Sequence, residues 1–149
     1  MHIVLYKPDI PQNTASIIRL SACLKLSLHI IEPCGFNLND IRFKKVVLDY
    51  MGLSKIFRYD SYNSFVKKNR KSRIVLMTTK AKKLYHKFKF KKNDMLLFGR
   101  ESAGVPKYLH RTIKNKLKIP MNKNTRSLNI AMSVAIISSE ALRQNDLLN

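Results

Sequence analysis

The amino-acid sequence predicts an α/β fold, a single domain whose mostly parallel sheet is covered by helices on both faces. Its 149 residues are the length of one domain with a sizeable core. Short aliphatic and β-branched runs, typical of buried parallel strands, alternate with longer segments of helical spacing. No internal repeat, low-complexity linker or change of composition divides the chain. We therefore expect residues 1–149 to form one α/β unit.

The first three elements show the alternation most clearly. His2–Tyr6 is a continuous run of mainly aliphatic residues, which favours a buried strand. The apolar residues of Asn13–Leu26 recur at helical spacing and predict a helix, with Asn13 or Thr14 as its N-cap. Leu28–Glu32 is the next apolar run and the next predicted strand. The remaining predicted elements, in chain order, are helices over Leu38–Met51 and Tyr62–Lys68, strands over Arg73–Thr79 and Met95–Gly99, a short helix near Lys107–Asn115, a strand over Lys116–Met121 and a helix over Ser127–Gln144.

The last predicted helix is unusually rich in alanine and serine, and its apolar residues lie on more than one face. Small side chains let another helix approach closely. We expect this helix to pack against its own sheet and against a partner subunit, with burial wholly inside the monomer as the alternative. Its small residues are Ala131, Ser133, Ala135, Ser138, Ser139 and Ala141.

Net charge is the strongest compositional signal. The chain carries 29 Lys and Arg against 9 Asp and Glu, a formal net charge of +20. Between Lys67 and Lys92 there are twelve basic residues and no acidic one. Such a surface favours a polyanion, because each neutralised phosphate releases counterions, so we expect a nucleic-acid partner. The alternatives are a genomic bias toward lysine, a solvated face and, more weakly, a basic membrane-surface protein.

Other features argue against whole classes of protein. No apolar run approaches the roughly 20 residues that span a bilayer. The N-terminus lacks a signal-peptide pattern, so we expect a cytoplasmic protein without membrane contact. Cys23 and Cys34 are the two cysteines, and neither belongs to a Cys/His cluster. We therefore expect two buried thiols and no metal site.

Three stretches rich in small and polar residues point to a ligand site: Pro8–Arg19, Phe98–Pro106 and Ile119–Asn129. The second and third include or directly follow apolar strand ends, and ligands of open α/β sheets sit beyond the carboxyl ends of strands. The sequence contains neither a GxGxxG fingerprint nor a P-loop. Because Gly99 and Gly104 lie in one of these loops, we expect a small-molecule cofactor site in the C-terminal half, beside a nucleic-acid substrate.

Several motifs occur in a specific order along the chain. They are Pro8-Asp9-Ile10-Pro11-Gln12-Asn13-Thr14, Ile17-Ile18-Arg19-Leu20, His29-Ile30-Ile31-Glu32-Pro33-Cys34-Gly35-Phe36, Leu48-Asp49-Tyr50, Phe98-Gly99-Arg100-Glu101-Ser102-Ala103-Gly104-Val105-Pro106, and Ile119-Pro120-Met121 with Arg126-Ser127-Leu128-Asn129. This set resembles the SPOUT (TrmH-like) superfamily of RNA methyltransferases and, within it, the TrmL/YibK group of tRNA (cytidine/uridine-2′-O-)-methyltransferases. The resemblance runs from about Ile3 to Gln144, essentially the whole chain.

The resemblance implies a fold and an activity. The fold is a single SPOUT domain with a C-terminal trefoil knot, whose knot and cofactor site span about residues 73–145. No appended RNA-binding domain is expected, and the assembly is a homodimer. The implied activity uses S-adenosylmethionine to methylate the 2′-hydroxyl of the wobble nucleotide of tRNA, position 34, a cytidine or modified uridine in leucine tRNAs. Neither a metal nor a membrane takes part.

The resemblance also implies roles for individual residues. Arg19 and Asn13 are placed near the reacting hydroxyl, and because a guanidinium stays protonated we expect Arg19 to clamp a phosphate and stabilise developing charge rather than act as a base. The implied catalytic residues are Arg19, Asn13, Glu101, Ser127 and Asn129; the implied cofactor contacts are Met77, Thr78, Gly99, Ile119, Met121, Ser127 and Leu128; the implied RNA contacts are Arg19, Arg100 and Arg126.

Four of these residues carry an argument or an alternative of their own. Gly99 is expected because a ligand lying against the main chain leaves no room for a Cβ. Asn129, inside the predicted last helix, is unfavourable by propensity, which favours a functional role. Arg100 stands where the family commonly has proline, and with Glu101 it is alternatively a surface feature.

For the whole chain, the alternatives are methylation of another tRNA or ribosomal RNA ribose, a noncatalytic RNA-binding SPOUT protein, and an S-adenosylmethionine-binding regulator, which the positive charge disfavours.

Overall fold

The computed structural model of the chain describes residues 1–147, and the side chains of Leu48, Asp49 and Met51 also lie outside the described residues. Two residues of the Leu48-Asp49-Tyr50 motif therefore have no described side chain. The strands are β1 (His2–Tyr6), β2 (Ser27–Ile31), β3 (Lys55–Tyr59), β4 (Ile74–Met77), β5 (Lys83–Leu84), β6 (Met95–Phe98) and β7 (Asn115–Lys118). The helices are α1 (Pro11–Cys23), α2 (Ile41–Met51), α3 (Tyr62–Lys68), α4 (Lys107–Thr112) and α5 (Ile130–Arg143), with a 3₁₀ turn, η1, at Tyr85–Lys87.

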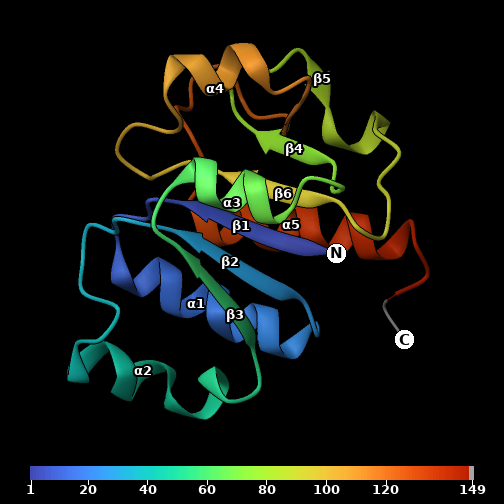
Figure 1. Cartoon of the computed structure of the whole chain (residues 1–149). Coiled ribbons are helices and arrows are strands. Elements are labelled where there is room, and N and C mark those ends of the chain that lie inside the picture. Colours follow the sequence, from blue (N-terminus) through green and yellow to red (C-terminus); the bar gives the residue numbers. More distant parts are fainter. Residues whose placement is uncertain (148–149) are drawn as a thin grey trace.

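A seven-stranded sheet forms the centre of the molecule, in the order β3-β2-β1-β6-β4-β7-β5 (Figure 1). Each neighbouring pair of strands is parallel. Parallel neighbours need crossover connections, and the helices between the strands supply most of them. The predicted α/β class with a mostly parallel sheet is confirmed, whereas the trefoil knot stays a prediction.

Alternate residues of the central strands face two separate cores. Ile3 and Leu5 of β1 belong to the core beneath α1 and α5, whereas Val4 and Tyr6 belong to the core beneath α3 and α4. All four side chains are at most 5% exposed, so β1 is buried on both faces. In Figure 1, α1, α2 and α5 lie on one side of the sheet and α3 and α4 on the other, which is the predicted two-sided cover.

The strand register brings the carboxyl ends of four strands, β1, β6, β4 and β7, next to one another. Phe98, the last residue of β6, lies beside Leu5 of β1 and Met77 of β4. Met77 in turn lies beside Leu117 of β7. The loops that follow these strands therefore leave the sheet next to one another, at the edge where ligands of open α/β sheets bind.

The observed elements differ from the predicted ones where polar residues interrupt the apolar pattern. β3 and β5 have no counterpart among the predicted strands, because both lie at the ends of the sheet and four of the seven side chains are exposed. α1 begins at Pro11 with Ile10 as its N-cap, so the prediction of Asn13 or Thr14 is wrong. Proline is favoured in the first turn because its missing N–H would have no helical partner there.

Asn129 is the N-cap of α5 and does not lie inside the helix. Its Oδ1 accepts hydrogen bonds from the backbone N–H groups of Ala131 at 2.8 Å and Met132 at 3.4 Å. Asparagine is among the most favoured residues at this position, so the predicted unfavourable propensity is wrong. β7 ends at Lys118, before the predicted strand end at Met121. Cys23 is exposed, which contradicts the expectation of two buried thiols; both cysteines are free.

A buried polar network crosses the sheet from β1 to β3. The His29 side chain is 3% exposed, its Nδ1 lies 2.8 Å from the Tyr59 hydroxyl, and its Nε2 lies 3.1 Å from Nδ1 of His2. The His29 ring also stacks on Phe57 at 4.8 Å between centroids. Burial, together with the neighbouring His2, lowers the pKa of His29 from 6.5 to about 4.

We expect the protein to lose stability as the pH falls from 6.5 to 4. In this range the unfolded chain protonates His29 and the folded chain does not, so acid favours unfolding by up to about 3 kcal/mol. Urea unfolding at several pH values measures the slope. His29→Gln should flatten it in this range, whereas the same change at the exposed His86 should alter it little. An unchanged slope in His29→Gln would contradict the prediction.

Candidate active site

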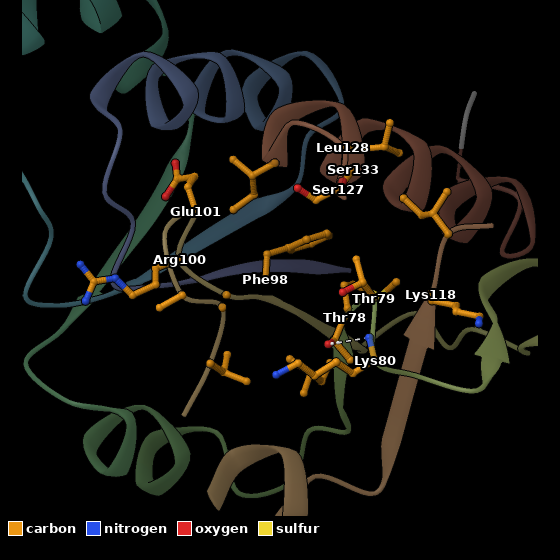
Figure 2. Close-up of a pocket in the computed structure, with 18 of the residues that line it drawn as sticks. Thr78, Thr79, Lys80, Phe98, Arg100, Glu101, Lys118, Ser127, Leu128 and Ser133 are labelled. Carbon is orange, nitrogen blue, oxygen red and sulfur yellow. Dashed lines mark hydrogen bonds between the residues drawn. The ribbon is translucent and has the colours of Figure 1, made fainter. Parts of the chain in front are cut away.

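A cavity of about 560 Å³ opens at the edge where β4, β6 and β7 end (Figure 2). This is within the roughly 300–1,000 Å³ range of small-molecule sites. Its walls come from the loops that follow these three strands, the first turn of α1 and the first turn of α5. Segments that are far apart in the sequence therefore share one site, which lies in the region predicted for the cofactor.

The cavity collects nearly all of the predicted cofactor and catalytic residues. All seven predicted cofactor contacts line it: Met77, Thr78, Gly99, Ile119, Met121, Ser127 and Leu128. Of the predicted catalytic residues, Asn13, Glu101, Ser127 and Asn129 line it and Arg19 does not. Of the predicted RNA contacts, Arg100 lines it, whereas Arg19 and Arg126 do not.

The loop after β6 folds back on itself through two glycines. Arg100 and Gly104 exchange two backbone hydrogen bonds of 3.1 and 2.8 Å, and Gly104 has a φ of +68°. A Cβ on Gly99 would lie 2.5 Å from the carbonyl carbon of Gly104. Glycine is needed here because the loop packs against its own backbone, which differs from the expected reason of space for a ligand.

A chain of hydrogen bonds joins three of the predicted catalytic residues. Oε1 of Glu101 accepts a hydrogen bond from Nδ2 of Asn13 at 3.1 Å, and Oε2 accepts one from the backbone N–H of Asp9 at 2.8 Å. Oδ1 of Asn13 accepts a hydrogen bond from Nδ2 of Asn129 at 2.9 Å. Because Asn129 also caps α5, the chain connects the β6 loop, α1 and α5. These side chains are thereby oriented on one wall of the cavity.

Asp9 supports this wall and was missed among the predicted site residues. Its carboxylate accepts hydrogen bonds from the Arg100 guanidinium, with Nε to Oδ1 at 3.0 Å, and from the backbone N–H of Ser102 at 3.1 Å. Hydrogen bonds from the Arg100 guanidinium and, to a smaller extent, from Ser102 hold the pKa of Asp9 well below its usual range, although partial burial acts to raise it. The presence of Asp9 in the first motif was the available signal. What the sequence could not supply was its partner, which is 91 residues away.

Arg19 lies on a different side of α1 from Asn13. Its guanidinium sits 5.0 Å from the centroid of the Tyr50 ring, a cation–π contact toward α2. Six residues are about 240° of rotation around a helix, which explains why the two side chains diverge. Arg126 is exposed in the loop before α5.

The wall opposite Glu101 is basic. Lys80, His110 and Lys118 line it, and Figure 2 shows Lys80 and Lys118 across the cavity from Arg100 and Glu101. Partial burial and the nearby Lys80 and Lys116 lower the pKa of His110. The backbone N–H of Lys80 donates to Oγ1 of Thr78 at 3.3 Å, which fixes the turn after β4. None of the three residues was among the predicted site residues.

The part of the chain that the structure describes contains neither a cluster of metal-ligating side chains nor a membrane-spanning helix. Among the described side chains of residues 1–147, no group of three or more His, Cys, Asp or Glu residues could hold a metal ion. Among the helices of the same residues, none is long and apolar enough to cross a membrane.

Comparison with known proteins shows similarity along almost the whole chain. A model of the SpoU rRNA Methylase family matches residues 1–139. A tRNA (cytidine(34)-2′-O)-methyltransferase of Ancylobacter novellus is 42% identical over 144 residues, which cover 95% of this chain and 91% of that protein. The enzyme of the same name from Escherichia coli K12 is 36% identical over 146 residues, covering 97% of this chain and 93% of its own length.

A solved structure shows the same similarity in three dimensions. It is described as giving structural insights into the 2-OH methylation of C/U34 on tRNA. It matches with a TM-score of 0.92 at 36% identity, covering 97% of this chain and 95% of the other. The TM-score over nearly the full length of both chains shows that the two proteins share one fold.

We expect Gly99→Ala to destabilise the protein by roughly 1–3 kcal/mol, because the new Cβ meets the Gly104 backbone and one of the two segments must shift. Urea unfolding measures the change. Gly52→Ala is the matched control, since a Cβ there meets nothing within 4 Å and the residue has a φ of −70°. Equal stability of the two variants would contradict the close approach of Gly99 and Gly104.

Proposed function

The chain belongs to the SpoU rRNA Methylase family and is an RNA 2′-O-methyltransferase, and we propose that it methylates the 2′-hydroxyl of nucleotide 34 of tRNA with S-adenosylmethionine as donor. The observation that carries the proposal is the near full-length similarity to enzymes named for position 34. The cavity adds support, because it collects all seven residues that the resemblance implies for cofactor binding.

The lining of the cavity fits S-adenosylmethionine. Ile119, Met121 and Leu128 offer apolar surface to an adenine ring, and Leu128 is 41% exposed rather than buried in the core. Glu101 adds a negative charge to the lining, and Lys80 and Lys118 add positive charges. When bound, S-adenosylmethionine supplies a methyl group carried on a positively charged sulfur. A cavity with apolar and charged walls matches a ligand of this mixed character.

The hydrogen-bonded wall is suited to orienting the substrate. We propose that Asn13, Asn129 and Glu101 position the ribose hydroxyl, and that the carboxylate receives the hydrogen bond that this hydroxyl donates. Their directions are fixed by hydrogen bonds of 2.8–3.1 Å before RNA arrives. Such preorganisation lowers the cost of aligning the reacting atoms. Ser127 lines the same cavity and is proposed to contact donor or hydroxyl.

The arginines are proposed to contact the RNA backbone. Arg19 and Arg126 lie outside the cavity lining, so in this proposal they bind phosphates rather than the reacting hydroxyl. Arg100 is held by Asp9 through Nε and Nη2, which leaves Nη1 for an RNA contact.

The finer substrate assignment follows from the resemblance. We propose leucine tRNAs with cytidine or a modified uridine at position 34, and we place the reaction in the cytoplasm, where tRNA is modified. The net charge of +20 supports a polyanionic substrate.

A homodimer is part of the proposal, with α5 in the interface. Val134, Ile137 and Ala141 are fully buried against the sheet, whereas Met132 is 62% exposed and Ser139 is exposed on another face. A second copy that covers this face would explain why apolar residues occur on both sides of the helix.

Incubation with methyl-labelled S-adenosylmethionine and tRNA from a strain without 2′-O-methylation at position 34 tests the activity. We expect label on the ribose of nucleotide 34 in leucine tRNAs, and mapping of the labelled nucleoside locates it. Label on another tRNA or ribosomal RNA ribose would move the target and keep the enzyme class. Binding of RNA and donor without label on any RNA would contradict the methyltransferase and leave a noncatalytic RNA-binding protein.

We expect Trp at Ala135 or Ser139 to yield a monomer and to abolish methylation, because a bulky ring blocks close approach of a second helix. Sedimentation or light scattering measures the assembly. Asn63→Trp, at an exposed position of α3 on the opposite face of the sheet, is the control and should stay dimeric. Two fully active and still dimeric α5 variants would exclude this interface.

A further inference from the structure

We propose that the β5–β7 edge of the sheet is the surface along which the RNA backbone approaches the cavity. We define this basic edge as residues 80–87 together with β7 and the loop before it; its lysines are Lys80, Lys82, Lys83, Lys87, Lys114, Lys116 and Lys118. The inference rests on the proposed function and assigns a binding surface to it.

The fold gathers these lysines at one end of the sheet. β5 is the outermost strand and pairs with β7, so that Lys83 lies beside Leu117 and Leu84 beside Lys118. Leu117 is fully buried, so the lysines on either side of it in β7 project to the other face of the strand. Lys83, the register partner of Leu117, points to the opposite face, with its Nζ 5.1 Å from the centroid of the Phe88 ring, so lysines of two segments about thirty residues apart flank both faces of this edge.

The positive charge of this edge is not neutralised by the protein. All five ion pairs among the described residues use arginine, and none uses a lysine. Between residues 80 and 126 the acidic residues are Asp94 and Glu101. Asp94 is 1% exposed and paired with Arg73, and both oxygens of Glu101 are hydrogen-bonded by α1 and the loop before it. Among the described residues, no carboxylate therefore neutralises a lysine of this edge.

The basic edge adjoins the cavity. Lys80 and Lys118 belong both to the edge and to the cavity lining, on the wall opposite Glu101. Lys116, in the same strand, donates from Nζ to the carbonyl of His110, another lining residue, at 2.8 Å. An RNA strand on this edge would bring a ribose to the cavity without crossing the acidic residues Glu32 and Asp40 near the β3 end of the sheet.

The test removes two edge charges and compares them with two charges at the other end of the molecule. The edge variant is Lys82→Ala with Lys83→Ala. The control is Lys44→Ala with Lys45→Ala, on α2, which lies far from β5 in Figure 1 and loses the same charge from exposed side chains. Binding of tRNA is measured at several salt concentrations, and binding of S-adenosylmethionine by calorimetry reports whether the cavity is intact.

We expect the edge variant to bind tRNA about tenfold more weakly and to reduce the slope of log K against log salt by roughly 2, because each phosphate contact contributes about one unit. Donor affinity should be unchanged, and the control should match the wild-type protein. Equal losses in both variants, or no loss in the edge variant, would overturn the assignment of the edge while leaving the methyltransferase in place. A wild-type protein that binds no tRNA would overturn both the edge and the proposed substrate.

Discussion

The cavity depends on the hydrogen bonds of one carboxylate, that of Glu101. Its two oxygens bind Asp9 and Asn13, which precede or begin α1, and Asn13 binds the cap of α5. Three loops that would otherwise move independently are thereby held at one edge of the sheet. Each bond lies at or near the protein surface and is modest alone, so the geometry depends on their connection rather than on any single one.

Several residues that line the cavity also support the local fold. Asn129 caps α5 with Oδ1 and orients Asn13 with Nδ2, so both ends of one amide are engaged. Gly99 lines the cavity and also permits the close return of the β6 loop. Because the fold already requires these residues, their presence in a sequence does not by itself separate a catalytic role from a structural one.

The two kinds of basic residue are used differently in this molecule. The arginines of the five ion pairs bind carboxylates in two-pronged contacts, and three of these pairs join segments at least 21 residues apart in the sequence. No ion pair among the described residues uses a lysine, and seven of the lysines lie along β5, β7 and the segments beside them. The fold thus separates a structural set of cations from a set available to a polyanion, although the sequence shows only a high total charge.

The sequence by itself determined the α/β class and the five main strands, because apolar periodicity is a local property, and its motifs identified the family and seven residues that line the cavity. It did not determine β3 and β5, whose exposed residues carry no strong pattern, nor the pairing of Asp9 with Arg100 or of Glu101 with Asn13. Those contacts join positions that are 91 and 88 residues apart. Only the tertiary structure decided that Arg19 faces Tyr50 rather than the cavity and that Lys80 and Lys118 share a wall, because the parallel register sets which loops meet.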